Sequence, residues 1–588
     1  MKKFIGIFSF AVILLSFTHK TGAQTIDDKW ITLFEKSNYY ETPRYTETME
    51  YFNRLAENSK HAKFVSIGKS PQGRDIMCLI LSKDKNFDAI SAKQAGKPIV
   101  LILNGIHSGE INGKDASMLL VRDILITKNK EQLLDNLTLL VIPIFSVDAH
   151  ERWSAYNRIN QIGPKEMGWR TTALNLNLNR DFMKADSPEM QCFLNFYNSW
   201  IPDFFIDVHS TDGSDYQYVS TFAIEKHENV SPLMGDWVKN VFNPYLINSV
   251  KNKGYEISPF VGFVEGDPSK GIYDWIPLPR FSNGYAAVQN RLGLLIESHI
   301  LKSYKDRVYS TKAMLESVLE LINQEPNTFI EISRKSDDYA LDTYIKKGYP
   351  YPLDFERTEK YDLFNYKGIG YEMIDSKVAG TKVKKFTGKP FEMEVPYHNQ
   401  VKASVSVNLP KAYIIPREWK DVVDRIKLHG VIVDSLAENK KYVVEKYKFS
   451  DVTFKKFPYE GRFNPSYNYF TVKDTITANK GDYFISTYQR TLGLIAHLLE
   501  PMGLDSFVKW GFFNSIFEQT EYYEDYAIEP IAAKMYEENQ LLRDEFNNKL
   551  QTDSLFESEA RQRFDFFYER TPYFDSSYNW YPVLRVVE

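Results

Sequence analysis

The chain has 588 residues, more than one hydrophobic core usually organises, so its length favours at least two domains. Hydrophobic residues make up 43% and charged residues 25%, a composition that excludes an intrinsically disordered chain. The formal net charge is −5 and no long basic block is present, so we do not expect nucleic acid as a partner.

The first residues have the pattern of a secretory signal peptide. Lys2 and Lys3 precede an apolar run at 4–17, and small residues at 21–23 come directly before Gln24. The run is short for a membrane span, and no later stretch approaches the length that crosses a bilayer. We therefore expect residues 1–23 to be removed and the mature chain to be exported, either to the periplasm or as a secreted protein.

The chain has two cysteines, Cys78 and Cys192. Neither lies at the cleavage site, which excludes attachment as a lipoprotein. Both have apolar neighbours, so we interpret them as small buried residues and not as a redox pair.

Residues 24–326 are predicted to form an α/β domain, because short apolar runs alternate with amphipathic stretches. The expected central strands are 98–103, 137–145, 203–208 and 293–296. The expected helices are 115–126, 188–200 and 308–322, and the helix at 188–200 opens with the Ser-Pro order of a cap and first turn.

Residues 327–588 are predicted to form a second, α+β domain of unknown role. The segment 401–407 alternates in the manner of an antiparallel strand, and 491–499 and 530–547 have helical patterns. The boundary near Asn327 rests on a change of composition.

A candidate metal site begins at His107 and Glu110, which follow the expected strand 98–103 after a three-residue turn. Open α/β sheets place their sites at such carboxyl ends. The spacing alone is weak evidence, since it recurs at His497 and Glu500 in a helical run, where we interpret it as structural.

His209 follows the expected strand 203–208 and completes a set of two imidazoles and one carboxylate. Three protein ligands leave a fourth tetrahedral position for water, which is typical of catalytic zinc. By itself, His209 is more simply a hydrogen-bonded histidine at a strand end.

Two further features carry chemistry. Glu297 ends an apolar strand, where a carboxylate must be either paired, with Arg291 or His299, or functional. Asn179 beside Arg180 offers an amide donor and a guanidinium fork, which suit a free carboxylate.

This ordered set resembles the zinc carboxypeptidase family, the carboxypeptidase A-like metallopeptidases: His-x-x-Glu, an Arg, Asn-Arg, His, then Glu on a late strand. Residues 68–76 also resemble the first strand pair and turn of that family, and the resemblance covers 63–323. It implies a mixed-sheet catalytic domain, a zinc ion held by His107, Glu110 and His209, and hydrolysis of C-terminal peptide bonds through a metal-activated water.

The resemblance also implies roles for other residues. Glu297 would activate the water and then protonate the leaving amine, and Arg170, with Arg158 as the fallback, would hold the oxyanion. Asn179 and Arg180 would bind the terminal carboxylate of a peptide substrate. Tyr285 and Tyr273 are alternatives for the tyrosine that caps the substrate.

Two departures from the family pattern concern Asn177, where the family often has an aspartate behind a zinc histidine, and Gly109, where it can have a substrate-contacting arginine. The region after Asn327 resembles the appended domain of bacterial envelope members and is assigned no chemistry. The oligomeric state is not predicted.

The alternatives to a carboxypeptidase are a zinc amidase or deacylase on the same scaffold and a non-catalytic envelope protein that binds peptides. The intact Glu297 favours an enzyme, because a binding protein has no need for it.

Overall fold

The structure, a computed structural model, describes residues 26–588. The predicted signal peptide therefore lies outside the described residues. Within them, no helix combines the length and the apolar character that a membrane crossing requires.

An eight-stranded mixed sheet forms the centre of the first domain and confirms the predicted fold class. Its strands lie in the order β1-β2-β4-β3-β5-β10-β6-β7. The strand β5 pairs in parallel with both β3 and β10, whereas β1–β2 and β10–β6 are antiparallel. The bounds are β1 (Ala62–Lys69), β2 (Asp75–Leu81), β3 (Ile99–Asn104), β4 (Thr138–Ile142), β5 (Phe204–Thr211), β6 (Ser220–Ile224), β7 (Ile257–Pro259) and β10 (Leu292–His299).

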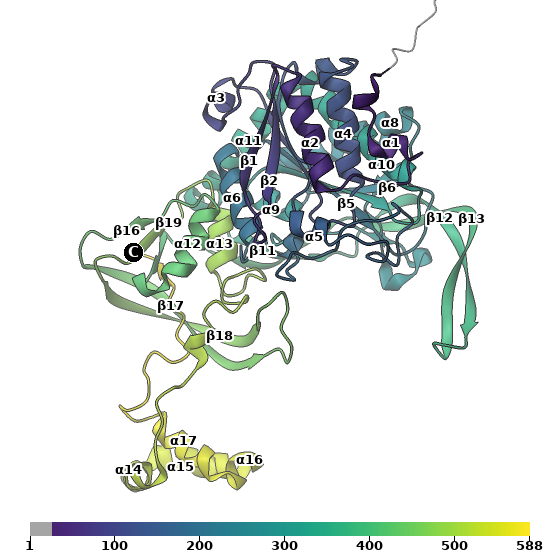
Figure 1. The fold of residues 1–588 in the computed structure, drawn as a ribbon. Helices are drawn as coiled ribbons and strands as arrows, with labels where there is room; N and C mark the ends of the chain where they lie inside the picture. Colours follow the sequence, from purple (N-terminus) through teal and green to yellow (C-terminus); the bar gives the residue numbers. More distant parts are fainter. Residues whose placement is uncertain (1–25) are drawn as a thin grey trace, which may run out of the picture.

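Every residue of β3 and β4 is buried, as expected of central strands that are covered on both faces. The core on one face is formed with α2 (Tyr45–Glu57), α4 (Asn112–Leu125), α8 (Asn243–Asn252) and α10 (Tyr304–Gln324). On the other face lie α6 (Pro188–Trp200) and α9 (Ser282–Val288), together with elements of the C-terminal region (Figure 1).

The helix α11 (Pro326–Ala340) corrects the predicted domain boundary. Phe329 and Ile332 of this helix belong to the core of the first domain, where Phe329 packs on Phe204 of β5. The change of composition near Asn327 therefore precedes the change of structure by one helix, and we place the boundary after the π-helical turn η7 (Leu341–Lys346).

The C-terminal region is built around a six-stranded sheet in the order β16-β19-β15-β20-β17-β18, which agrees with the predicted α+β class. The strands β12 and β13 form a long projecting arm (Figure 1). A separate helical cluster is formed by α14 and α15 with α16 (Ser554–Ser558) and α17 (Ala560–Tyr568). The bounds are β11 (Tyr351–Arg357), β12 (Asp362–Ser376), β13 (Thr381–His398), β14 (Val401–Val407), β15 (Ala412–Ile415), α12 (Lys420–Leu428), β16 (Asp434–Ser435), β17 (Lys440–Phe454), β18 (Pro465–Ala478), β19 (Tyr483–Ser486), α13 (Leu492–Leu499) and β20 (Leu584–Val586).

The predicted helix 530–547 is in fact two helices, α14 (Asp525–Glu538) and α15 (Gln540–Thr552). They are separated at Asn539, whose side chain accepts a hydrogen bond from the Leu542 N–H and so caps the second helix. The predicted bounds of α6 and β14 agree with the structure at both ends.

The first turn of α6 contains a buried acid that makes stability depend on pH. Glu189 is fully buried, and neither carboxyl oxygen has a hydrogen-bond partner. Burial, aided by repulsion from Asp148 and Asp181, raises the pKa of Glu189 to about 7. The folded state therefore prefers the protonated form, and stability falls as pH rises from the unfolded pKa to the folded one.

We predict that Glu189→Gln, which cannot ionise, is more stable than the parent at pH 8 and close to it at pH 5. The difference between the two pH values should be about 2 kcal/mol in the free energy of unfolding. Urea denaturation of both proteins at each pH measures it. An equal difference at both pH values would show that Glu189 does not titrate between them.

Candidate metal centre and active site

The turn after β3 sets the positions of His107 and Glu110. Gly105 has a φ of +69°, and the Glu110 N–H donates to the His107 carbonyl at 2.9 Å, which closes the turn before α4. A Cβ at Gly113 would lie 2.3 Å from Asn104 Oδ1 and 2.7 Å from a Val208 methyl, so only glycine allows α4 to approach β5 this closely. The result is that Glu110 lies against the end of β5.

His209 and Glu297 are neighbours across the β5–β10 pair. The parallel register places Glu297 opposite His209. Paired residues of adjacent strands project from the same face of a sheet, so the two side chains share one side of it. The Ser210 N–H on β5 donates to Glu110 Oε2 at 3.0 Å, which ties the turn to the strand.

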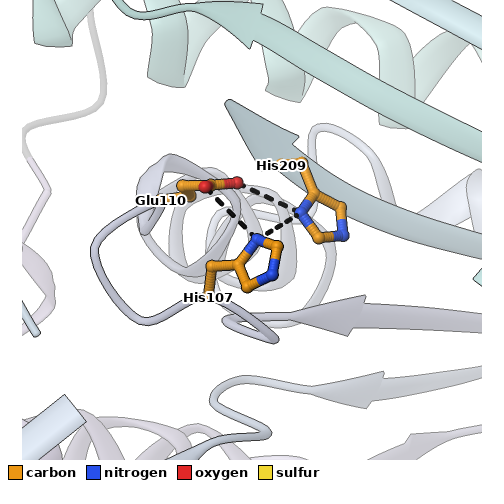
Figure 2. A group of neighbouring side chains, drawn as sticks. All are labelled: His107, Glu110 and His209. Atoms are coloured by element: carbon orange, nitrogen blue, oxygen red, sulfur yellow. Dashed lines mark hydrogen bonds and ion pairs between the residues drawn. The ribbon is translucent and has the colours of Figure 1, made fainter. Parts of the chain in front are cut away.

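The side chains of His107, Glu110 and His209 converge, as Figure 2 shows. The two Nδ1 atoms lie 3.2 Å apart, and each lies within 3.2 Å of a Glu110 oxygen. All three residues are buried, and among the residues that the structure describes they form the single cluster with the spacing of metal ligands.

The opposite nitrogen of each imidazole has its own acceptor. His107 Nε2 bonds to Asn177 Oδ1 at 2.9 Å, and His209 Nε2 bonds to Asp207 Oδ2 at 2.6 Å. A proton on each Nε2 leaves both Nδ1 lone pairs directed at each other and at the carboxylate. Such an arrangement requires a cation, and two imidazoles with one carboxylate are a donor set that zinc accepts.

The electrostatics of the cluster agree with this. Burial acts to raise the pKa of Glu110, but His107 and Arg158 hold it well below its usual value. Burial acts to lower the pKa of His209, but Asp207 and Glu110 raise it well above its usual value, whereas burial dominates and lowers the pKa of His107. The field of the carboxylates therefore favours positive charge at the Nδ1 edge, which a proton or a metal ion can supply.

Glu297 faces the same space. It lines a cavity of about 510 Å³ together with the three candidate ligands, and its Oε2 has no hydrogen-bond partner. Burial raises its pKa to about 8, with repulsion from Glu110 and Asp207 adding to the rise. The two predicted structural partners are engaged elsewhere: Arg291 pairs with Asp337 at 3.0 Å, and His299 Nε2 bonds to the Ser214 carbonyl at 3.0 Å.

Both candidate arginines reach Glu110 Oε1, Arg158 at 2.9 Å and Arg170 at 3.2 Å. The Arg170 side chain is 43% exposed and that of Arg158 only 13%, so Arg170 is the freer of the two to turn to a ligand. A Cβ at Gly109 would lie 2.7 Å from Arg158 Cγ. The absence of a side chain at Gly109 is therefore what makes room for Arg158.

Asn179 and Arg180 lie in a short 3-10 helix, η3 (Leu178–Arg180), on the cavity wall. Asn179 Oδ1 accepts from the Ser282 N–H at 3.2 Å, and the Arg180 guanidinium lies 4.4 Å from the Phe281 ring centroid. These contacts hold both polar groups on the wall of the cavity that the triad also lines.

The structure does not bring Tyr285 to the site, which corrects its predicted role in substrate binding. Tyr285 is fully buried in the core, and its hydroxyl lies 3.1 Å from His429 Nδ1. The alternative, Tyr273, lines the cavity, where Arg357 stacks on its ring at 4.3 Å. The second His-x-x-Glu pair is structural as predicted, because Glu500 forms a buried ion pair with Arg585 at 3.0 Å.

Sequence reasoning missed Asp207. The signal was present, because residues two apart in a strand lie on the same face, so an aspartate two positions before His209 is placed to bond its ring. Asp207 supplies a carboxylate behind a metal-facing imidazole, while Asn177 supplies an amide behind the other.

Residues 48–234 match the family model described as zinc carboxypeptidase. Over these residues the chain is similar to the zinc carboxypeptidase family. The match includes all three candidate ligands and Arg170, Asn179 and Arg180, and it ends before Glu297. Zinc is the metal of this family, and the triad fits it.

Two curated relatives of this chain are fungal. Carboxypeptidase 2 from Trichophyton rubrum is 22% identical over 497 residues, 80% of this chain and 84% of that protein. Carboxypeptidase 2 from Trichophyton equinum is 22% identical over 495 residues, with the same coverage. A solved structure of a metallo-carboxypeptidase from Pseudomonas aeruginosa is 17% identical over 49% of this chain and 71% of its own, with a TM-score of 0.36.

We predict that the protein binds one zinc ion per chain and that Asp207→Asn weakens this binding by about 10- to 100-fold, the usual cost of changing a group bonded to a metal-binding histidine. Competition with a chelator measures the affinity, and elemental analysis measures the stoichiometry. The matched control is Asp236→Asn, the same change at an exposed position of α7 (Pro232–Trp237). Zinc retained in a His107→Ala/His209→Ala double variant would contradict the site.

Proposed function

We propose that this chain is a zinc-dependent metallocarboxypeptidase that hydrolyses the C-terminal bond of peptides, and that it acts after export through the Sec-type signal at 1–23. The observation that carries the proposal is the unpaired carboxyl oxygen of Glu297, which faces the same cavity as the triad and Arg180. The match to the zinc carboxypeptidase model at 48–234 supports the reaction, and the position of these side chains supports their roles.

His107, Glu110 and His209 would hold the zinc ion. When bound, zinc supplies Lewis acidity, which makes water a nucleophile at neutral pH and polarises a carbonyl group. Asp207 and Asn177 keep each Nε2 protonated and so keep each Nδ1 available to the metal. The burial of the triad keeps competing bulk water away from these atoms.

Glu297 would carry protons in both halves of the reaction. Its carboxylate accepts a proton from the attacking water and then donates it to the leaving amine, so that the amine departs neutral. Arg170 would stabilise the negative oxygen that develops on the scissile carbonyl, with Arg158 as the second donor beside it. Both arginines already contact Glu110, the carboxylate of the triad.

Asn179 and Arg180 would bind the terminal carboxylate of the peptide. A guanidinium held by stacking on Phe281 loses little rotational freedom on binding, which favours a bidentate contact. One part of the cavity wall is aromatic and apolar, formed by Phe260, Tyr273, Trp275, Phe281 and Leu295. We therefore propose that large apolar side chains are preferred at the cleaved end, with Tyr273 in contact with the bound terminus.

An amidase or deacylase on the same scaffold would keep the triad and Glu297 but would use Arg180 on a different anion. A peptide-binding envelope protein would need neither the unpaired Glu297 oxygen nor a metal. The position of Arg180 beside Asn179 on the wall of the triad's cavity favours the carboxypeptidase, because a guanidinium there can bind a free terminal carboxylate.

We predict that Glu297→Gln lowers kcat by about 10² to 10⁴, the usual effect of losing a general base. The substitution keeps the shape of the side chain, so folding and zinc content should match those of the parent. Steady-state kinetics on a C-terminally free peptide with a terminal phenylalanine measures the effect. A Gln variant that hydrolyses this peptide at the parent rate would make Glu297 a structural residue.

We predict that Arg180→Ala raises KM for peptides with a free terminal carboxylate and reduces the discrimination against their amidated forms, because its role is to bind that charge. Parallel assays of one peptide in free and amidated form measure the ratio. Lys305→Ala, which removes a cation that stacks on Tyr39 outside the cavity, is the control. Equal losses on both substrates would favour an amidase or an endopeptidase.

A further inference from the structure

A tight turn of the C-terminal region, Tyr459-Glu460-Gly461-Arg462, touches the active site. The backbones of Tyr459 and Arg462 exchange two hydrogen bonds, at 2.9 and 3.1 Å, so the turn has two central residues. Both have positive φ, +51° at Glu460 and +78° at Gly461. Glycine, asparagine and aspartate suit such positions, whereas glutamate does so poorly.

The strained backbone of Glu460 costs free energy, which a contact of its side chain can offset. Its carboxylate supplies one, because Glu460 Oε2 accepts a hydrogen bond from the Asn177 N–H at 2.9 Å. Gly461 lies against the adjoining residue, since a Cβ there would be 3.3 Å from a Leu176 methyl. The turn therefore packs directly on the loop that leads to Asn179 and Arg180.

Asn177 connects that loop to the metal site. Its Oδ1 accepts from His107 Nε2 at 2.9 Å and from the Asn179 N–H at 3.0 Å. The backbone donor at Asn179 fixes which atom of the amide is the oxygen. One side chain thus orients a metal ligand and a residue of the carboxylate-binding pair, and Glu460 holds the backbone from which it projects.

The turn is fixed on both sides of Glu460. Arg462 forms a two-pronged ion pair with Asp186, with both N···O distances 2.6 Å, and its guanidinium stacks on Phe512 at 3.5 Å. The Tyr459 ring is parallel to Trp510, with centroids 5.9 Å apart. These contacts on both sides fix the turn, and with it the position of Glu460 beside Asn177.

We infer that Glu460 is a positioning residue for the zinc site, which makes the C-terminal region a structural part of the active site. It acts through Asn177 on His107 and touches neither metal nor substrate. The inference rests on the proposed function for the identity of the metal, and it names a second-domain contribution that the family match at 48–234 does not include.

The test is the zinc affinity of Glu460→Asn, measured by chelator competition, which needs no peptidase activity. Asparagine tolerates the left-handed backbone better than glutamate but is one carbon too short to reach Asn177. We expect zinc binding to weaken about three- to tenfold, less than for a direct partner of a ligand. The thermal unfolding temperature of the metal-free protein should stay equal or rise. If Glu460 only supported the fold, the variant would bind zinc as tightly as the parent and its metal-free form would unfold at a lower temperature.

Two further variants complete the design. Glu460→Gln keeps the length and an acceptor oxygen, and its zinc affinity should lie between those of the parent and the Asn variant. Glu438→Asn, the same change at an exposed position of the same region, should match the parent. The inference is overturned if Glu460→Asn binds zinc as tightly as the parent, or if the unfolding temperature of its metal-free form falls together with its zinc affinity. Parent protein that binds zinc but cleaves no peptide would overturn the proposed function and leave this comparison intact.

Discussion

Parallel pairing of β5 with β3 on one side and β10 on the other is the constraint on which the site depends. It brings three carboxyl ends to one edge of the sheet, so that residues far apart in the sequence become neighbours without any long-range side-chain contact. His209 lies opposite Glu297 because of backbone register alone. A slip of one residue would turn one of the two side chains to the other face. The apolar, fully buried strands that fix this register are therefore as important to the chemistry as the polar residues at their ends.

A second consequence is the concentration of negative charge that the edge creates. Glu110, Asp207 and Glu297 lie together in a buried setting, and unpaired carboxylates cannot remain ionised there. The structure meets this cost with Arg158 and Arg170 on one side of Glu110 and with the imidazoles on the other. A divalent cation at the triad completes the compensation. The same charge distribution thus favours metal binding and leaves Glu297 Oε2, like Asp207 Oδ1, without a hydrogen-bond partner.

The parts of this arrangement that could be predicted from sequence are those that depend on local pattern. The strands at 98–103 and 203–208 and both ends of α6 are encoded by short apolar runs and by a Ser-Pro cap, and the structure has them within a few residues. The triad could be predicted because His107 and Glu110 follow one such strand after a short turn and His209 lies near the end of another. The prediction that Tyr285 contacts substrate was wrong, because the local sequence of a tyrosine beside a site does not differ from that of a tyrosine in a core. The boundary near Asn327 was wrong because composition changes before packing does.

The contact between Glu460 and Asn177 could not be predicted in this way, since 283 residues separate the partners and nothing in either segment refers to the other. Its physical origin lies in the length of the loop it supports. Between α5 (Val147–Glu151) and η3 the chain runs without a helix or strand, yet it carries both arginines that face Glu110. Loops of this length do not hold a fixed shape through their own hydrogen bonds and need an external support. Part of that support comes from the turn after β3 and from α10, through the Ser108–Gly168 backbone contact and Arg307 on the Gly163 carbonyl. The rest comes from the turn at 459–462, and the shared core between α6 and the α12–α13 layer fixes that turn relative to the sheet. A candidate site built on a rigid edge and a long loop therefore requires the second domain, because the edge alone positions the candidate metal ligands but not the groups that we propose bind substrate.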